Sequence, residues 1–191
     1  MAQRLTSRTI TGRLVDIFRR EGFDGASLTI LAKGTGLGRA SFYHHFPGGK
    51  SDMARAAYER ASRDFTKAVL APLAGSSPPG ERLQRMVNGL DAFYDGGRGT
   101  CLIDVFTLGG ARDLFRDEIT EAVAYWSDAI VRVLEEAGLD HAEAKSRSES
   151  TIVAVEGALV LCRASQSSEP FRRVLERIVP ELLEGTTARA A

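Results

Sequence analysis

The sequence of 191 residues has few cysteines and no long hydrophobic run, so it shows no sign of a disulfide framework or a membrane anchor. Its two cysteines, Cys101 and Cys162, are too few for a disulfide framework and form no CxxC site. The longest nearly apolar run, residues 152–162, is too short to span a bilayer. No apolar region and no small-residue cleavage site follow the first ten residues, so we expect no secretory signal. With 43% hydrophobic and 26% charged residues, the composition is that of a soluble globular protein. We therefore expect a reduced, cytoplasmic chain.

Motifs for catalysis and for nucleotide binding are absent or misplaced. The glycines at 34, 36 and 38 and the Gly-Lys-Ser at 49–51 imitate phosphate-binding loops, but a helical pattern precedes both, where those loops need a strand. The adjacent His44 and His45 point about 100° apart on a helix, so they cannot share a metal. There is no GxSxG or HExxH motif. We expect no enzyme activity, metal or cofactor, although scattered carboxylates could still form an active site.

Charge is distributed unevenly along the chain, although the net charge is zero. Residues 1–50 hold eight Lys and Arg against three Asp and Glu, which gives +5. The other 141 residues hold 17 basic and 22 acidic side chains, which gives −5. A basic amino-terminal region on an acidic remainder indicates that the first part meets a polyanion, unless the excess is only a solvated helix face.

Hydrophobic periodicity indicates helices throughout. Apolar residues at helical spacing predict a helix ending near Gly22 and Gly25, a short one after Ser27, and a third over 39–45. A longer helix runs from residue 50 to about 73, and 75–80 is a loop. Further helices are predicted over 81–95, 101–115, 117–137, 141–165 and 168–184, with Asp140 as a helix cap. No segment alternates as a strand does, so the fold is predicted to be all-α with about nine helices.

Residues 27–46 carry the pattern of a helix-turn-helix. Small residues, Ala32 and Gly36, stand where the two short helices would cross. Leu28, Leu31, Leu37, Phe42 and Phe46 would hold the pair against the first helix, and the outer face of the second helix is polar. An ordinary helical hairpin would satisfy the same pattern.

These residues resemble the amino-terminal domain of the tetracycline-repressor (TetR) family. The resemblance covers about residues 8–60 and is carried by Phe18–Phe23, Ser27–Ala32, Gly36–Pro47 and Lys50. A looser resemblance, in residues 100–106 and 156–159, is to the carboxy-terminal, ligand-binding domains of TetR members of the LmrA/YxaF type. Together the two resemblances imply a helix-turn-helix DNA-binding domain over 1–50, which extends into a connecting helix at 50–73. They also imply an effector-binding and dimerisation domain over 74–191.

The resemblance also implies roles for individual residues. Arg39, Ala40, Ser41 and His44 would face the major groove, Gly38 would cap their helix, and Ser27, Thr29, Tyr43 and Lys50 would hold phosphates. Three departures from the family pattern are Gly38 where a serine is usual, the apolar Ile30, and an extra glycine before Lys50.

The resemblance implies a homodimeric repressor that a small apolar effector releases from a palindromic operator. The two carboxy-terminal helices would form the dimer, because Val153, Val160 and Ala164 on the first and Leu175, Val179 and Leu183 on the second lie beside the main apolar stripe. The same pattern would arise if both helices were central in a monomer. The candidate effector-binding residues are apolar or aromatic: Phe93, Tyr94, Cys101, Val105, Phe106, Trp126, Ile130 and Leu159.

Two other interpretations stay open at this point. Cys101 or Cys162 could act as a redox sensor if a nearby cation lowered its pKa. Alternatively, the protein could be a small-molecule-binding or enzymatic helical bundle whose basic amino-terminal region is incidental.

Overall fold

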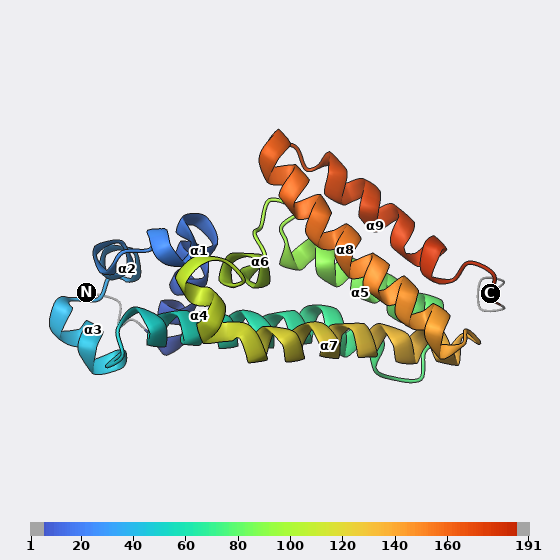
Figure 1. The fold of residues 1–191 in the computed structure, drawn as a ribbon, viewed down its shortest axis with the longest axis horizontal. Coiled ribbons are helices and arrows are strands. Elements are labelled where there is room, and N and C mark those ends of the chain that lie inside the picture. Colours follow the sequence, from blue (N-terminus) through green and yellow to red (C-terminus); the bar gives the residue numbers. More distant parts are fainter. Residues whose placement is uncertain (1–5, 187–191) are drawn as a thin grey trace. The chain divides into compact units, whose positions relative to one another are not determined.

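The computed structural model describes residues 6–186, with the backbone alone at positions 39 and 40. This described part contains nine α-helices and no strand, which confirms the predicted all-α fold (Figure 1). The elements are α1 (Ser7–Gly25), α2 (Leu28–Thr35), α3 (Arg39–His45), α4 (Lys50–Phe65), the π-helical η1 (Thr66–Leu70), the 3₁₀-helical η2 (Ala71–Leu73), α5 (Pro79–Phe93), α6 (Leu102–Phe106), the 3₁₀-helical η3 (Gly109–Ala111), α7 (Arg112–Glu136), α8 (His141–Ser165) and α9 (Glu169–Leu182).

The chain divides into two compact units that are not simple halves. Unit 1 consists of Met1–Arg63 and Thr100–Ile119, and unit 2 of Asp64–Gly99 and Thr120–Ala191. The sequence-based boundaries assigned residues 100–119 to the body, whereas they pack with the amino-terminal residues. The assignment of functions to the two regions stays a prediction.

A cluster of aromatic rings forms the centre of unit 1. The Phe106 ring, fully buried, lies 4.6 Å from Phe115 and 5.6 Å from Phe18, measured between centroids, and it also neighbours Phe23 and Tyr58. Its partners come from α1, α4 and α7, so α6 is held to the amino-terminal helices by ring packing.

Two polar contacts reinforce the same arrangement in unit 1. The Gly110 N–H donates to the Asp24 carboxylate at 3.1 Å, which joins η3 to the end of α1. Arg55 on α4 is paired with Glu118 on α7, and this hydrogen bond holds the pKa of the Glu118 carboxyl below its ordinary value. Residues 102–119 are thus tied to the amino-terminal helices by polar as well as apolar contacts.

The predicted helix over 101–115 is wrong as a single element. The chain forms a short α6, leaves the helical conformation at Leu108 and Gly109, and begins α7 at Arg112. Gly109 has φ +57°, and a Cβ at this position would lie 2.0 Å from an Asp24 carboxylate oxygen. The break follows from the close approach to α1, which periodicity along one segment cannot reveal.

A second aromatic cluster lies in unit 2. The ring of Phe65 lies 5.0 Å from that of Trp126 and 5.3 Å from that of Phe93, and Tyr94 connects Phe93 to Phe171. The helices α8 and α9 pack along one another (Figure 1). Their apolar stripes, predicted from periodicity, are buried at Ile152, Val155, Leu159 and Cys162 and at Phe171, Ile178 and Leu182.

Candidate nucleic-acid interface

The two short helices α2 and α3 are fixed by local capping and by contacts with α1. The Ile30 N–H donates to Ser27 Oγ at 3.3 Å, which confirms Ser27 as the cap of α2. Gly36 ends α2 with φ +75°, a left-handed conformation that favours glycine. Arg13 of α1 donates to the Thr35 carbonyl oxygen at 2.9 Å. The turn between the helices is therefore held by α1.

Helix α3 presents its polar residues to solvent and its aromatic anchors to the core. Phe42 and Phe46 are 3% and 8% exposed, whereas Ser41, Tyr43 and His44 are exposed. Gly38 is the N-cap of α3 and, having no side chain, supplies no side-chain hydrogen bond there. The backbone of Arg39 and Ala40 forms the first turn of α3, and their side chains lie outside the described part. The side chains of α3 that the structure describes therefore separate into an inner and an outer set.

A hollow of about 390 Å³ lies between α2 and α3. It is lined by Leu28, Thr29, Ala32, Phe42 and Tyr43. Thr29 and Tyr43, two of the predicted phosphate contacts, thus border one surface depression. Ser27 is also exposed, at the start of α2. These side chains are accessible from outside the chain.

Leu28 differs from its expected role. The sequence pattern placed it on the inner face, but its side chain is 42% exposed and borders the hollow. Leu31, by contrast, is fully buried. Leu28 is the first residue of α2, directly after the Ser27 cap. No helical turn precedes it that could cover its side chain. Its position at the helix start is the one signal that could have indicated this exposure.

Lys50 has a partner inside unit 1. Its ammonium group donates to the Phe23 carbonyl oxygen at 3.1 Å and lies 4.5 Å from the centroid of the Phe23 ring. The Gly48 N–H donates to Asp52 at 2.6 Å at the start of α4. The two contacts with Phe23 give Lys50 a structural role in joining α4 to α1, beside the phosphate contact predicted from the resemblance.

The candidate effector-binding residues are divided between the two units. Cys101, Val105 and Phe106 belong to unit 1, whereas Phe93, Tyr94, Trp126, Ile130 and Leu159 belong to unit 2. Six of the eight are buried, and three of these, Tyr94, Phe106 and Trp126, pack in aromatic clusters, while Phe93 and Val105 are partly exposed. Within unit 2, Phe93, Tyr94 and Trp126 share one aromatic cluster with Phe65, a residue outside the predicted effector set.

Both cysteines lie buried in the described part of the chain. Cys101 and Cys162 are each 4% exposed, and buried thiols in apolar surroundings are generally inert. Within residues 6–186, no group of three or more His, Cys, Asp or Glu side chains is placed to hold a metal ion. None of the helices described is long and apolar enough to cross a membrane.

Two sequence families match the chain over complementary ranges. The family "Bacterial regulatory proteins, tetR family" matches residues 14–57, which include α2 and α3. The family "Transcriptional regulator LmrA/YxaF-like, C-terminal domain" matches residues 79–177, more than half of the chain. The first range contains the predicted DNA contacts and the second contains α5 to most of α9. The two ranges agree with both resemblances stated from the sequence.

Individual relatives extend over most of the chain. The HTH-type transcriptional regulator LmrA of Bacillus subtilis is 23% identical over 172 residues, which are 88% of this chain and 91% of LmrA. The uncharacterized HTH-type transcriptional regulator YxaF of the same organism is 22% identical over 166 residues, 85% of this chain and 87% of its own.

Solved structures share the fold at similar identities. A TetR transcriptional regulator from Legionella pneumophila aligns with a TM-score of 0.78 at 20% identity, covering 93% of this chain and 97% of its own. The regulatory protein TetR from Rhodobacter sphaeroides aligns with a TM-score of 0.76 at 20% identity, covering 93% and 98%. Together with the helix-turn-helix geometry and the matched families, these likenesses show that the chain belongs to the TetR family of DNA-binding transcriptional regulators.

Proposed function

We propose that the protein is a homodimeric repressor that binds a palindromic operator and is released by a small apolar effector. The observation that carries the DNA-binding part is the exposed polar face of α3, held in place by the buried Phe42 and Phe46. A short helix with a solvent-facing polar side, fixed by apolar anchors on the other, can enter the major groove as a rigid element.

The proposed contacts fall into two groups with different roles. Arg39, Ala40, Ser41 and His44 would read base edges in the groove, and Ser27, Thr29 and Tyr43 would hold phosphates and so fix the register. The hollow between α2 and α3 supports the second group, because Thr29 and Tyr43 border it together. Lys50 is proposed to act mainly through Phe23, by orienting α4.

The test is selection of binding sites from random duplex DNA, followed by a salt titration of the enriched sequence. Enrichment of a palindrome is expected. A dimer that neutralises about six phosphates should lose roughly a thousandfold in affinity between about 50 and 200 mM salt. A helical bundle with an incidental basic region would enrich no sequence at low salt, and that result would contradict the proposal.

A second copy of the chain is proposed to cover the outer face of α8 and α9. Val153, Val160 and Leu161 on α8 are 71%, 45% and 57% exposed, and Gly157 between them allows close approach of another helix. A groove of about 570 Å³ runs beside them, with Arg173, Glu176 and Arg177 of α9 among its lining residues. Apolar residues bordered by charges of both signs form the usual pattern of a self-complementary interface.

The surface of α9 that is open to a proposed partner differs from the one expected. Leu175 and Leu183 were predicted to face the partner, but they are 9% and 4% exposed and belong to the core of unit 2. The exposed contribution of α9 to the groove comes instead from Arg173, Glu176 and Arg177. The sequence pattern missed this because Leu175 and Leu183 are covered within the same chain, while Val179, the third predicted residue, is half-buried.

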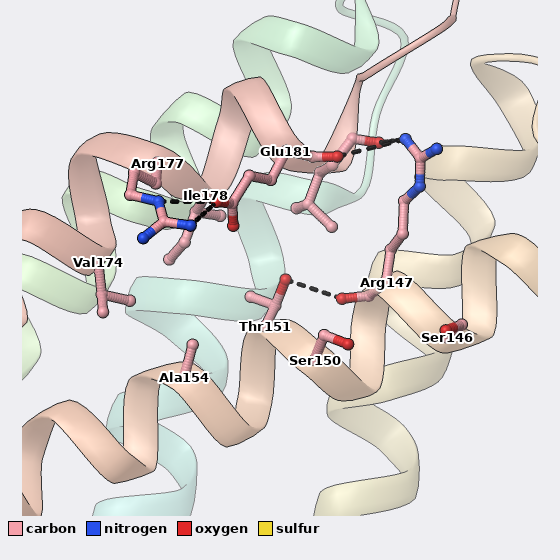
Figure 2. A pocket seen from close by; sticks show the side chains of 10 residues that line it. Ser146, Arg147, Ser150, Thr151, Ala154, Val174, Arg177, Ile178 and Glu181 are labelled. Atoms are coloured by element: carbon pink, nitrogen blue, oxygen red, sulfur yellow. Dashed lines mark hydrogen bonds and ion pairs between the residues drawn. The ribbon is translucent and has the colours of Figure 1, made fainter.

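Figure 2 shows how α9 is held against α8 at the far end of this face. The Arg147 guanidinium donates to the carbonyl oxygens of Glu181, Leu182 and Glu184 at 3.2, 3.2 and 2.7 Å. The first two carbonyls belong to the last turn of α9 and the third follows it, at a helix end where cations are favourable. The adjacent hollow of about 180 Å³ is lined by residues of both helices, including Ser150 and Ala154 of α8 and Val174 and Ile178 of α9. The helix pair is therefore fixed before any partner binds.

Replacing Val153 by Asp is expected to convert the dimer into a monomer. An unpaired carboxylate buried in each half of an interface costs about 3 kcal/mol or more, so dimerisation should weaken at least a hundredfold. Light scattering should show a mass falling from twice 20.7 kDa to 20.7 kDa. Leu108→Asp, at a position 66% exposed in unit 1, is the matched control and should stay dimeric. A wild-type mass of 20.7 kDa at micromolar concentration would refute the dimer.

A further inference from the structure

Two side chains of α1, one turn apart, hold the carbonyl end of α2. The Arg13 guanidinium donates from Nη1 to the Thr35 carbonyl oxygen at 2.9 Å. Ile17 packs against the backbone of Gly34, where an added Cβ would lie 2.5 Å from Ile17 Cδ1. Carbonyl groups in the last turn of a helix have no partner within that helix, and a cation beside them is favourable. Arg13 therefore caps α2 from a neighbouring helix.

The capped residue, Thr35, leads directly into the turn before α3. Its side chain is fully buried, and its hydroxyl donates to the Leu31 carbonyl oxygen at 2.7 Å, inside α2. Its own carbonyl points out of α2 and accepts from Arg13. Residues 36–38 alone separate it from the start of α3, and Gly36 among them has the left-handed conformation. A shift of the Thr35 carbonyl is therefore passed directly to the first turn of α3.

Helix α3 depends on contacts from outside for its position. It spans only Arg39–His45, and helices this short are marginal without such contacts. Its N-cap, Gly38, has no side chain that could cap it. The buried rings that anchor it, Phe42 and Phe46, lie in its middle and directly after its last residue. The placement of its first turn therefore depends on residues 36–38, which Arg13 holds through Thr35.

We propose that Arg13 is a positioning residue that gives the protein its preference for the operator over other DNA. Contacts with phosphates form on any sequence, whereas contacts with base edges need side chains held to within about 0.5 Å. An α3 with a loose first turn would keep the first kind of contact and lose the second. The inference rests on the proposed function, because it makes the selectivity of the same helix depend on a residue that does not touch DNA.

The variant Arg13→Met tests this assignment, because it keeps an apolar stem and removes the donor and the charge. Arg20→Met is the matched control: it removes the same charge from α1, where Arg20 pairs only with the adjacent Glu21 among the ion pairs of the described part. Fluorescence anisotropy measures binding to the duplex that the wild type enriches and to a scrambled duplex of equal composition. A hydrogen bond to a charged group corresponds to about tenfold in affinity.

Relative to Arg20→Met, the Arg13→Met protein should bind the enriched duplex at least about tenfold more weakly, and about a hundredfold if two protomers share it. Its affinity for the scrambled duplex and its salt dependence should match those of the control, because no phosphate contact is lost. The melting temperature is measured for both. If that of Arg13→Met falls, the same comparison is made with Arg13→Gln, whose shorter amide cannot reach the Thr35 carbonyl and suits an exposed helical position.

Two results would overturn the proposal. Equal losses on both duplexes, with a shallower salt dependence, would make Arg13 a phosphate contact. Unchanged preference for the enriched duplex would show that the Thr35 contact does not control α3. The wild-type selection separates this inference from the function on which it rests. If the wild type enriches no sequence, the proposed function fails; if it does and Arg13→Met keeps the preference, only the role of Arg13 fails.

Discussion

Replacing Tyr43 by alanine is expected to lower operator affinity about a hundredfold without changing the melting temperature. The side chain is 56% exposed, and its ring contacts that of Phe42 at a centroid distance of 5.8 Å. Losing one hydrogen bond to a charged phosphate costs about 1.5 kcal/mol, and a dimer loses two, which is about 3 kcal/mol or roughly 150-fold. Fluorescence anisotropy of a labelled operator duplex measures the change.

Tyr125 offers a matched control for this variant. It is 52% exposed on α7, outside the predicted DNA-binding face, and Tyr125→Ala should leave operator affinity unchanged. The variant Tyr43→Phe separates the hydroxyl group from the ring, and most of the loss should follow the hydroxyl. Equal effects of Tyr43→Ala and Tyr125→Ala would show that α3 does not meet DNA through Tyr43.

Replacing Phe106 by alanine is expected to destabilise the protein by about 3–5 kcal/mol, the usual cost of removing a buried phenylalanine. The Phe106 ring is fully buried and contacts rings from α1, α4 and α7, so its loss leaves a cavity that several elements would have to fill. Urea denaturation followed by circular dichroism gives the change in the free energy of unfolding.

The same experiment bears on the role of Phe106 as a candidate effector residue. The control Leu108→Ala, two residues along the chain and 66% exposed, should change stability by no more than about 0.5 kcal/mol. A stable Phe106→Ala protein that no longer responds to effector would favour the binding role. A large loss of stability would place Phe106 in the structural core of unit 1.

Local signals in the sequence were enough to predict most helices. Asp140 is the N-cap of α8 and accepts the Glu143 N–H at 3.0 Å, as expected from its spacing. The buried stripe of α7 includes Trp126, Ile130 and Val133, which follow the predicted 3.6-residue period. Capping and periodicity depend on residues a few positions apart, so a sequence alone reveals them.

Features that depend on distant residues could not be predicted in this way. The break at Gly109 follows from the approach of Asp24, which lies 85 positions earlier. The burial of Leu175 and Leu183 follows from packing within unit 2, and periodicity cannot distinguish it from a dimer interface. The predicted DNA contacts came from the family resemblance. The structure places Ser27, Thr29, Ser41, Tyr43 and His44 on the surface, and their roles on DNA stay predictions.

The assembly of unit 1 from two separate stretches of sequence affects how regulators of this kind can be recombined. A chimera that takes only the first 63 residues would leave Phe18, Phe23 and Tyr58 without the rings of Phe106 and Phe115. It would also leave Asp24 without the Gly110 N–H. We therefore expect that a chimera made to exchange operator specificity must include residues 100–119 together with the helix-turn-helix, so that two segments of the sequence are transferred and not one.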